Sequence, residues 1–140
     1  GSTERLEELR EHLNTEFEWE FASAAARSAA SLTYSLSLDA VVVFTSDGRS
    51  GELLASYRPR APLFAVTAEP RVATKLALHW GVTPEVRPTP ETVRDACGVA
   101  ASILRDAGIG PGSRYALVIG FPAGERTNSI LLQTVSEPRA

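Results

Sequence analysis

The chain alternates between short runs of apolar residues and longer segments in which apolar residues recur every three or four positions. The short runs predict five strands, at about Ala40–Phe44, Leu63–Thr67, Thr83–Arg87, Tyr115–Gly120 and Ser129–Val135. The periodic segments between them predict three helices, which end near Tyr57, Gly81 and Ala107. The first begins near Asp47 or Ser50 and the second at Glu69–Pro70. The third begins within Thr89-Pro-Glu-Thr92, which supplies a cap, a first-turn proline and an acid. Such strand and helix alternation is typical of a parallel sheet with right-handed crossovers.

The connection before the last strand decides the direction of that strand. Residues Phe121–Asn128 are too few for a parallel crossover, which needs a dozen or more residues, so the last strand is expected to run antiparallel. The predicted fold class is therefore α/β: three layers around a five-stranded, mostly parallel sheet with an antiparallel last strand.

Two helices are predicted before the first strand. One covers about Thr3–Asn14, and the other covers about Glu16–Ser37. Apolar residues of the first share a narrow face: Leu6, Leu9 and Leu13. In the second, residues at helical spacing define a face for burial against the sheet: Phe17, Phe21, Ala24, Ala25, Ser28, Ala29, Leu32 and Leu36. We expect residues 1–16 to comprise a tag remnant, Gly1–Ser2, and the first helix, and residues 17–140 to form one domain.

Composition narrows the class of protein without naming a function. With 140 residues, 44% of them hydrophobic, the chain is long enough for a single buried core. A net charge of −3 and the lack of a basic stripe argue against nucleic-acid binding. Cys97 is the only cysteine, which suits a reducing, cytoplasmic setting, and no apolar segment is long enough to span a membrane. No metal-binding spacing or cofactor motif is present.

The candidate chemistry lies in the turn after the first strand, Thr45-Ser46-Asp47-Gly48-Arg49-Ser50. Hydroxyls, a guanidinium, a glycine and a helix start together suit a phosphate, because the first turn of a helix carries unpaired N–H groups. Asp47 opposes this, since a carboxylate about 4 Å from a phosphate charge is repelled by about 4 kcal/mol at an effective dielectric near 20. The alternative is that these residues only cap the helix and form the turn.

A second loop, Gly120–Asn128, follows the fourth strand at its carboxyl end, where open α/β sheets bind ligands. We expect Gly124, Arg126 and Thr127 to close over the first loop, although a plain hairpin connection is an equal alternative. The remaining candidates favour structural roles: Cys97 core packing, and His12 and His79 solvated surface positions. No combination of acid, base and nucleophile predicts an enzyme.

The order of several short motifs resembles one known family. The motifs are Ala26-Arg-Ser-Ala29, Val42-Val-Phe-Thr45, Gly48-Arg-Ser50, Tyr57-Arg-Pro-Arg-Ala-Pro62, Ala65-Val-Thr67, Trp80-Gly-Val82 and Thr127-Asn128. From about Phe17 to Val135 the chain resembles the C-terminal domain of pyruvate kinase, and it shows no likeness to the catalytic barrel of that enzyme. The resemblance implies a non-catalytic regulatory and oligomerisation domain, whose partners are further copies of the chain or the catalytic barrel.

In family members activated by fructose 1,6-bisphosphate, the loop after the first strand holds one phosphate and the loop before the last strand folds over the sugar. The resemblance therefore assigns effector binding to the same two loops. This chain departs from the pattern at Asp47, where many relatives have serine or threonine, and its second loop lacks a tryptophan. Another phosphorylated metabolite, or none, is the alternative effector. A stand-alone small-molecule-binding module and a small hydrolase are the alternative functions.

Overall fold

The computed structural model describes residues 1–120 and 127–139. Its four helices are α1 (Ser2–Ser35), α2 (Arg49–Ser56), α3 (Pro70–Leu76) and α4 (Val93–Asp106). Its five strands are β1 (Ala40–Phe44), β2 (Leu63–Thr67), β3 (Val82–Val86), β4 (Arg114–Ile119) and β5 (Ser129–Thr134). All five predicted strands are confirmed, with ends that differ by at most one residue.

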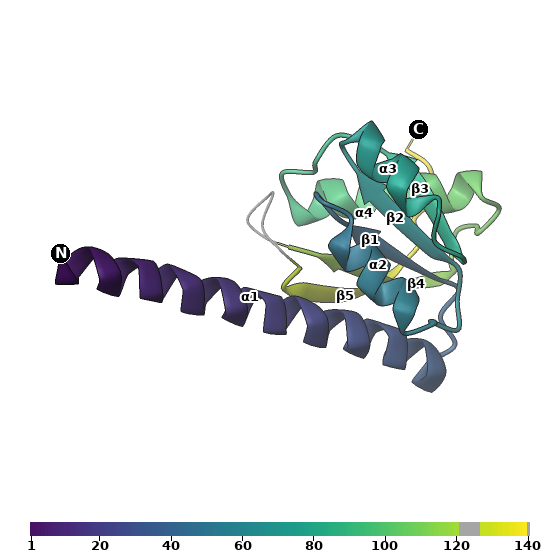
Figure 1. Ribbon diagram of the computed structural model, residues 1–140. Coiled ribbons are helices and arrows are strands. Elements are labelled where there is room, and N and C mark those ends of the chain that lie inside the picture. The colour runs from purple at the N-terminus through teal and green to yellow at the C-terminus, as the bar shows by residue number, and fades with distance from the viewer. Residues whose placement is uncertain (121–126, 140) are drawn as a thin grey trace.

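The strands form one sheet in the order β3-β2-β1-β4-β5. The first three pairings are parallel, and β5 pairs antiparallel with β4, placing Leu132 opposite Ala116. The predicted direction of the last strand is therefore confirmed. Helices α1, α2 and α3 cover one face of the sheet and α4 covers the other, which gives the three predicted layers (Figure 1).

Alternate residues of each central strand enter different cores. On one face Val41 and Val43 pack with Leu54 of α2 and Leu76 of α3. On the other face Val42 packs with Leu104 of α4 and with Leu117 of the neighbouring strand β4. Because both faces are covered, β1 is buried along its whole length, which explains its continuous apolar sequence.

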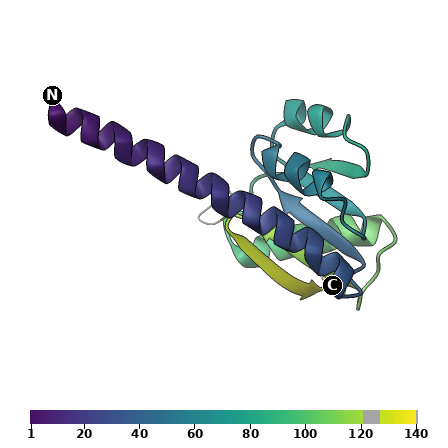
Figure 2. The ribbon, with the colours of Figure 1, turned by 60° about the horizontal axis from the view of Figure 1, so that its bottom comes forward.

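The amino-terminal prediction of two helices is wrong, because α1 is one continuous helix of 34 residues. Its first half extends away from the sheet into solvent, and only its second half lies against the domain (Figures 1 and 2). Before Ala22, every residue of α1 except Trp19 is exposed. Residues 14–16 contain no proline or glycine, so nothing in the local sequence interrupts the helix.

The face of α1 that packs on the sheet also differs from the predicted face. The buried positions are Ala22, Ala26, Ala29, Ala30 and Thr33. Phe17 and Phe21 are instead more than half exposed. Small residues allow α1 to approach the sheet closely, and the larger aromatic side chains are left on the outer side.

One end of α3 and one end of α4 lie away from their predicted positions. Helix α3 ends at Leu76 and not near Gly81, because the N–H groups of Leu78 and His79 bond to carbonyls three residues back. This tighter turn leaves Trp80 92% exposed, although the helical spacing predicted it on the apolar side. Helix α4 begins at Val93 with Thr92 as its N-cap, whose Oγ1 accepts from the N–H of Asp95 at 3.0 Å, so the prediction that Thr89 caps the helix and Pro90 lies in its first turn is wrong.

Candidate functional site

The predicted loop lies at the carboxyl end of β1 and leads directly into α2. Gly48 is the N-cap of α2 and has a φ of 90°, in the left-handed region where non-glycine residues are strained. The Thr45 Oγ1 accepts a hydrogen bond from the Gly48 N–H at 2.9 Å, and this bond closes the turn. The tight turn is thus built by one hydroxyl and one glycine.

Buried hydroxyl groups gather where the strands end. Thr45, Ser50, Thr67 and Thr127 are each less than 10% exposed. The Thr127 Oγ1 donates to the Ser50 Oγ at 2.7 Å, joining two segments that are 77 residues apart in the chain. The predicted contact between Thr127 and the first loop is confirmed. Gly124 and Arg126 lie outside the described residues.

Asp47 faces the start of α2 without being its N-cap residue. Its Oδ1 accepts from the Arg49 N–H at 3.0 Å, and its Oδ2 lies 3.8 Å from the Arg49 Nε. The carboxylate therefore occupies an N–H group that an anion would otherwise use. Its side chain is 56% exposed, so it also adds negative charge at the open side of the loop.

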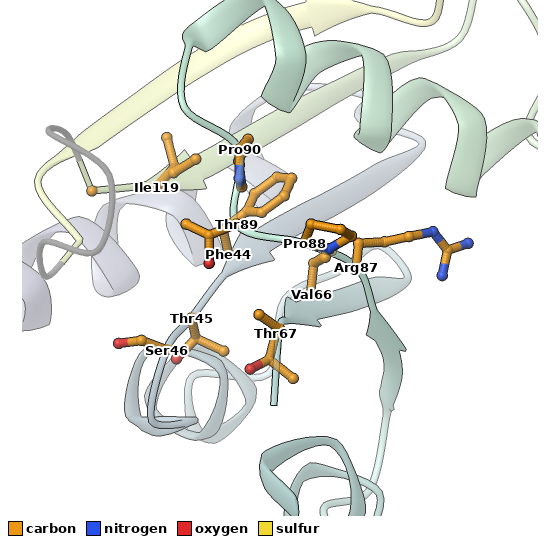
Figure 3. A pocket seen from close by; sticks show the side chains of 12 residues that line it. Phe44, Thr45, Ser46, Val66, Thr67, Arg87, Pro88, Thr89, Pro90 and Ile119 are labelled. Carbon is orange, nitrogen blue, oxygen red and sulfur yellow. The ribbon is translucent and has the colours of Figure 1, made fainter. Parts of the chain in front are cut away.

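A small pocket of about 50 Å³ opens beside this loop (Figure 3). Its lining includes Thr45 and Ser46 from the loop and Thr67 from the end of β2. This volume holds a few water molecules, which is far less than the roughly 300–1,000 Å³ typical of small-molecule sites. The pocket therefore suits a single phosphate-sized group better than a whole sugar phosphate.

Arg87 also lines the pocket, and the sequence interpretation missed it. It follows β3, so its position after a strand end was the available signal. Figure 3 shows its side chain extending away from Thr45 and Ser46, and its Nη1 lies 3.1 Å from the Glu85 Oε2. Its guanidinium therefore adds little positive charge to the pocket in this arrangement.

Arg49 is not brought to the pocket either. Its guanidinium stacks over the Trp19 ring of α1, with the Cζ atom 4.7 Å from the ring centroid. It lines a different, larger groove on the outer side of α2. The loop residues thus divide between two places: Thr45 and Ser46 line the strand-end pocket, and Arg49 lies on the opposite side of the loop.

The other candidate residues have structural surroundings. Burial raises the pKa of the Cys97 thiol, so this group stays protonated at neutral pH and is a poor nucleophile. His79 Nε2 lies 3.8 Å from Glu52 Oε1, a partner that the sequence interpretation did not identify. Within residues 1–120 and 127–139, no group of three or more His, Cys, Asp or Glu could hold a metal ion. None of the helices described is both long and apolar enough to cross a bilayer.

Residues 23–132 match the protein family described as "Pyruvate kinase, alpha/beta domain". Pyruvate kinase from Geobacillus stearothermophilus is 32% identical over 117 residues, which cover 81% of this chain and 20% of that protein. Pyruvate kinase from Chlamydia muridarum is also 32% identical, over 127 residues, with 84% of this chain and 24% of the relative covered. The chain thus spans between a fifth and a quarter of these relatives.

Solved structures give the same fold. The crystal structure of a pyruvate kinase from Cryptosporidium parvum superimposes with a TM-score of 0.73 at 22% identity, covering 81% of this chain and 22% of that one. The five-stranded sheet with its antiparallel last strand is an α/β arrangement, as the description of the matched family states, and the match covers most of the chain. This chain therefore belongs to the family of the pyruvate kinase alpha/beta domain.

Proposed function

We propose that the chain is a non-catalytic regulatory and oligomerisation domain of the pyruvate kinase type, located in the cytoplasm, which binds a phosphorylated metabolite beside the loop after β1. The chain spans only a fifth to a quarter of the matched pyruvate kinases, and its sequence shows no likeness to the catalytic barrel of that enzyme, which supports a non-catalytic role. A hydrolase function lacks support, because within residues 1–120 and 127–139 the Ser50 Oγ bonds to the Thr127 hydroxyl and not to a general base. Two features support the proposal.

The first feature is the apolar stripe on α1, and it carries the oligomerisation part. Residues Leu6, Leu9, Leu13, Phe17 and Phe21 each remain 53–64% exposed. Their spacing of three or four residues places them on one side of the helix, opposite the alanine face that packs on the sheet. A contiguous apolar surface of this kind marks a site of association. We therefore expect copies of the chain to associate through this stripe.

Replacing Leu9 and Leu13 together by glutamate is expected to return the associated chain to a monomer of 15.0 kDa, because the carboxylates cannot be buried between helices. Light scattering after gel filtration measures the mass. The matched control is Thr15→Glu, which adds a charge on the opposite side of the same helix and should leave the mass unchanged. A monomeric unmodified chain at micromolar concentration would refute this part.

The second feature is the loop pocket, which supports phosphate binding. The start of α2 carries a partial positive charge, and Thr45 and Ser46 place hydroxyls beside it. The Asp47 carboxylate opposes an anion at the same place. Its half-exposed position weakens the repulsion through solvent screening. The affinity for a phosphorylated ligand therefore depends on this one carboxylate.

We expect Asp47→Ser to tighten the binding of sugar phosphates about tenfold, which corresponds to about 1.4 kcal/mol, while the serine hydroxyl keeps the turn capped. A thermal-shift panel of sugar phosphates measures binding, since a ligand at 100 times its Kd stabilises the fold by about 2.7 kcal/mol. The control is Asp95→Ser, which removes a carboxylate from the first turn of α4. The phosphate-binding proposal fails if no sugar phosphate raises the melting temperature of the unmodified chain or of the Asp47→Ser variant. It also fails if the Asp47→Ser and Asp95→Ser variants bind sugar phosphates with the same affinity.

A further inference from the structure

An open groove of about 1040 Å³ lies over the outer side of α2. The proposed phosphate site at the loops after β1 and before β5 does not include it. Trp19 of α1 forms one wall, and His79 and Trp80 from the connection after α3 form another. Both tryptophans of the chain therefore line the same groove. Its volume is at the upper end of the range for small-molecule sites, about twenty times that of the strand-end pocket.

The first cation of the groove is held in place by an aromatic ring. The Arg49 guanidinium lies over Trp19, with Cζ 4.7 Å from the ring centroid. Stacking limits the freedom of a long side chain, so less entropy is lost when a ligand binds. The Trp19 and Arg49 pair thus presents an oriented guanidinium at the amino-terminal end of α2.

The second cation, Arg58, has an unusual backbone. Its φ of 50° makes it the only described non-glycine residue with a positive φ. The Tyr34 hydroxyl donates to the Arg58 carbonyl at 2.7 Å, and the Arg58 N–H bonds to the Ala55 carbonyl at 3.0 Å. Strained backbone held by surrounding contacts is typical of functional positions. These contacts fix Arg58 at the other end of α2.

The charges along the groove favour an anion. Glu52 is the carboxylate in its lining, and its Oε1 lies 3.0 Å from the Lys75 Nζ and 3.8 Å from the His79 Nε2. Lysine therefore neutralises that carboxylate. Arg58 has no carboxylate within 4 Å among the residues whose positions are described, so its charge remains available to a ligand.

We propose that this groove binds a nucleoside phosphate, a planar aromatic ring that carries phosphate. Indole faces stack on a base whatever its identity, and guanidinium groups bind phosphate oxygens in a bidentate fashion. Trp80, 92% exposed, supplies a stacking face, and Arg58 supplies the phosphate contact. The net charge of −3 disfavours a polynucleotide, so the expected ligand is a free nucleotide. This site is independent of the pocket beside Thr45 and Ser46.

Intrinsic tryptophan fluorescence tests the proposal directly, because both tryptophans of the chain line the groove. Titration with AMP and with ATP is expected to give a saturable change in emission. Adenosine, which lacks phosphate, and ribose 5-phosphate, which lacks the ring, are each expected to bind at least about tenfold more weakly than AMP. Equal binding of either fragment and AMP would overturn the proposal, as would the lack of a saturable signal with both nucleotides.

Variants locate the site. Arg58→Asn removes the guanidinium and keeps a residue that tolerates the left-handed backbone, and it is expected to weaken AMP binding about tenfold. Trp80→Ala should weaken binding similarly without loss of thermal stability, since its side chain is solvent-exposed. The matched control is Arg94→Ala, an exposed arginine on α4 at the opposite face of the sheet, which should leave the Kd unchanged. Normal affinity in both groove variants would contradict the assignment.

Discussion

Leu117→Ala is expected to lower the free energy of unfolding by about 2–5 kcal/mol, which is a large share of the roughly 5–15 kcal/mol typical of a domain. Leu117 lies on the interior strand β4, opposite Val42 of β1, and is completely buried between the sheet and α4. Removing three carbons there reduces the buried apolar surface. It also leaves a cavity that the neighbouring strands cannot close without breaking their pairing.

Urea unfolding measures the loss, and Leu132→Ala serves as the matched control. Leu132 lies on the adjacent strand β5 but is 52% exposed, so the same truncation should cost less than about 1 kcal/mol. A thermal scan should show the Leu117 variant melting about 5–15 °C lower. Equal losses in both variants would mean that burial on β4 does not determine stability.

Gly48→Ala is expected to destabilise the fold by about 2–4 kcal/mol, for two separate reasons. The φ of 90° costs a residue with a β-carbon about 1–2 kcal/mol. The added carbon would also lie 3.2 Å from the Val72 Cγ1 of α3, closer than ordinary contact, and crowding of this kind costs about 1–3 kcal/mol. Relief by movement of α3 would reduce the second contribution.

The same substitution at Gly98 should have the opposite sign. Gly98 lies in the middle of α4 and is exposed, and a methyl group added to its Cα would meet open space. Alanine there should stabilise the protein by about 0.5–1 kcal/mol, because glycine loses more backbone entropy in a helix. Chemical denaturation of both variants checks the pair. Gly48→Ala being as stable as Gly98→Ala would contradict the strain at the turn.

The Gly48 variant also bears on the proposed phosphate site. The turn holds the Thr45 hydroxyl and the Asp47 carboxylate against the first N–H groups of α2. Moving that turn would therefore change sugar-phosphate binding. Arg49 of the nucleotide groove follows Gly48 directly and would move with the turn, whereas Arg58 lies beyond the other end of α2. Loss of sugar-phosphate binding with retained nucleotide binding would show that the two proposed sites are separate.

Local pattern was sufficient for the strands. Residues 40–44 are apolar without interruption because both faces of β1 are covered, so the sequence itself records the burial. The direction of β5 followed from the length of the connection before it. The turn at Gly48 was likewise predicted from local chemistry, which acts over three or four residues.

The helices showed where local pattern fails. Phe17 and Phe21 share a helical face with Ala24 and Ser28, and this face was expected on the sheet. The sheet instead receives Ala22, Ala26 and Ala29, because close approach of α1 to a twisted sheet favours small side chains. Periodicity reveals that a helix has an apolar stripe, but it does not reveal which surface covers that stripe.

The strands, the direction of the last one, the tight turn at Gly48 and the likeness to a known domain could all be predicted from the amino-acid order, because each depends on neighbouring residues. Two arrangements became visible only in the folded chain: the Arg49 guanidinium stacks on Trp19, and Arg58 and Trp80 line one groove. Each of them brings together residues that are far apart in the chain. Their partners are chosen by the packing of whole elements, which no local spacing encodes.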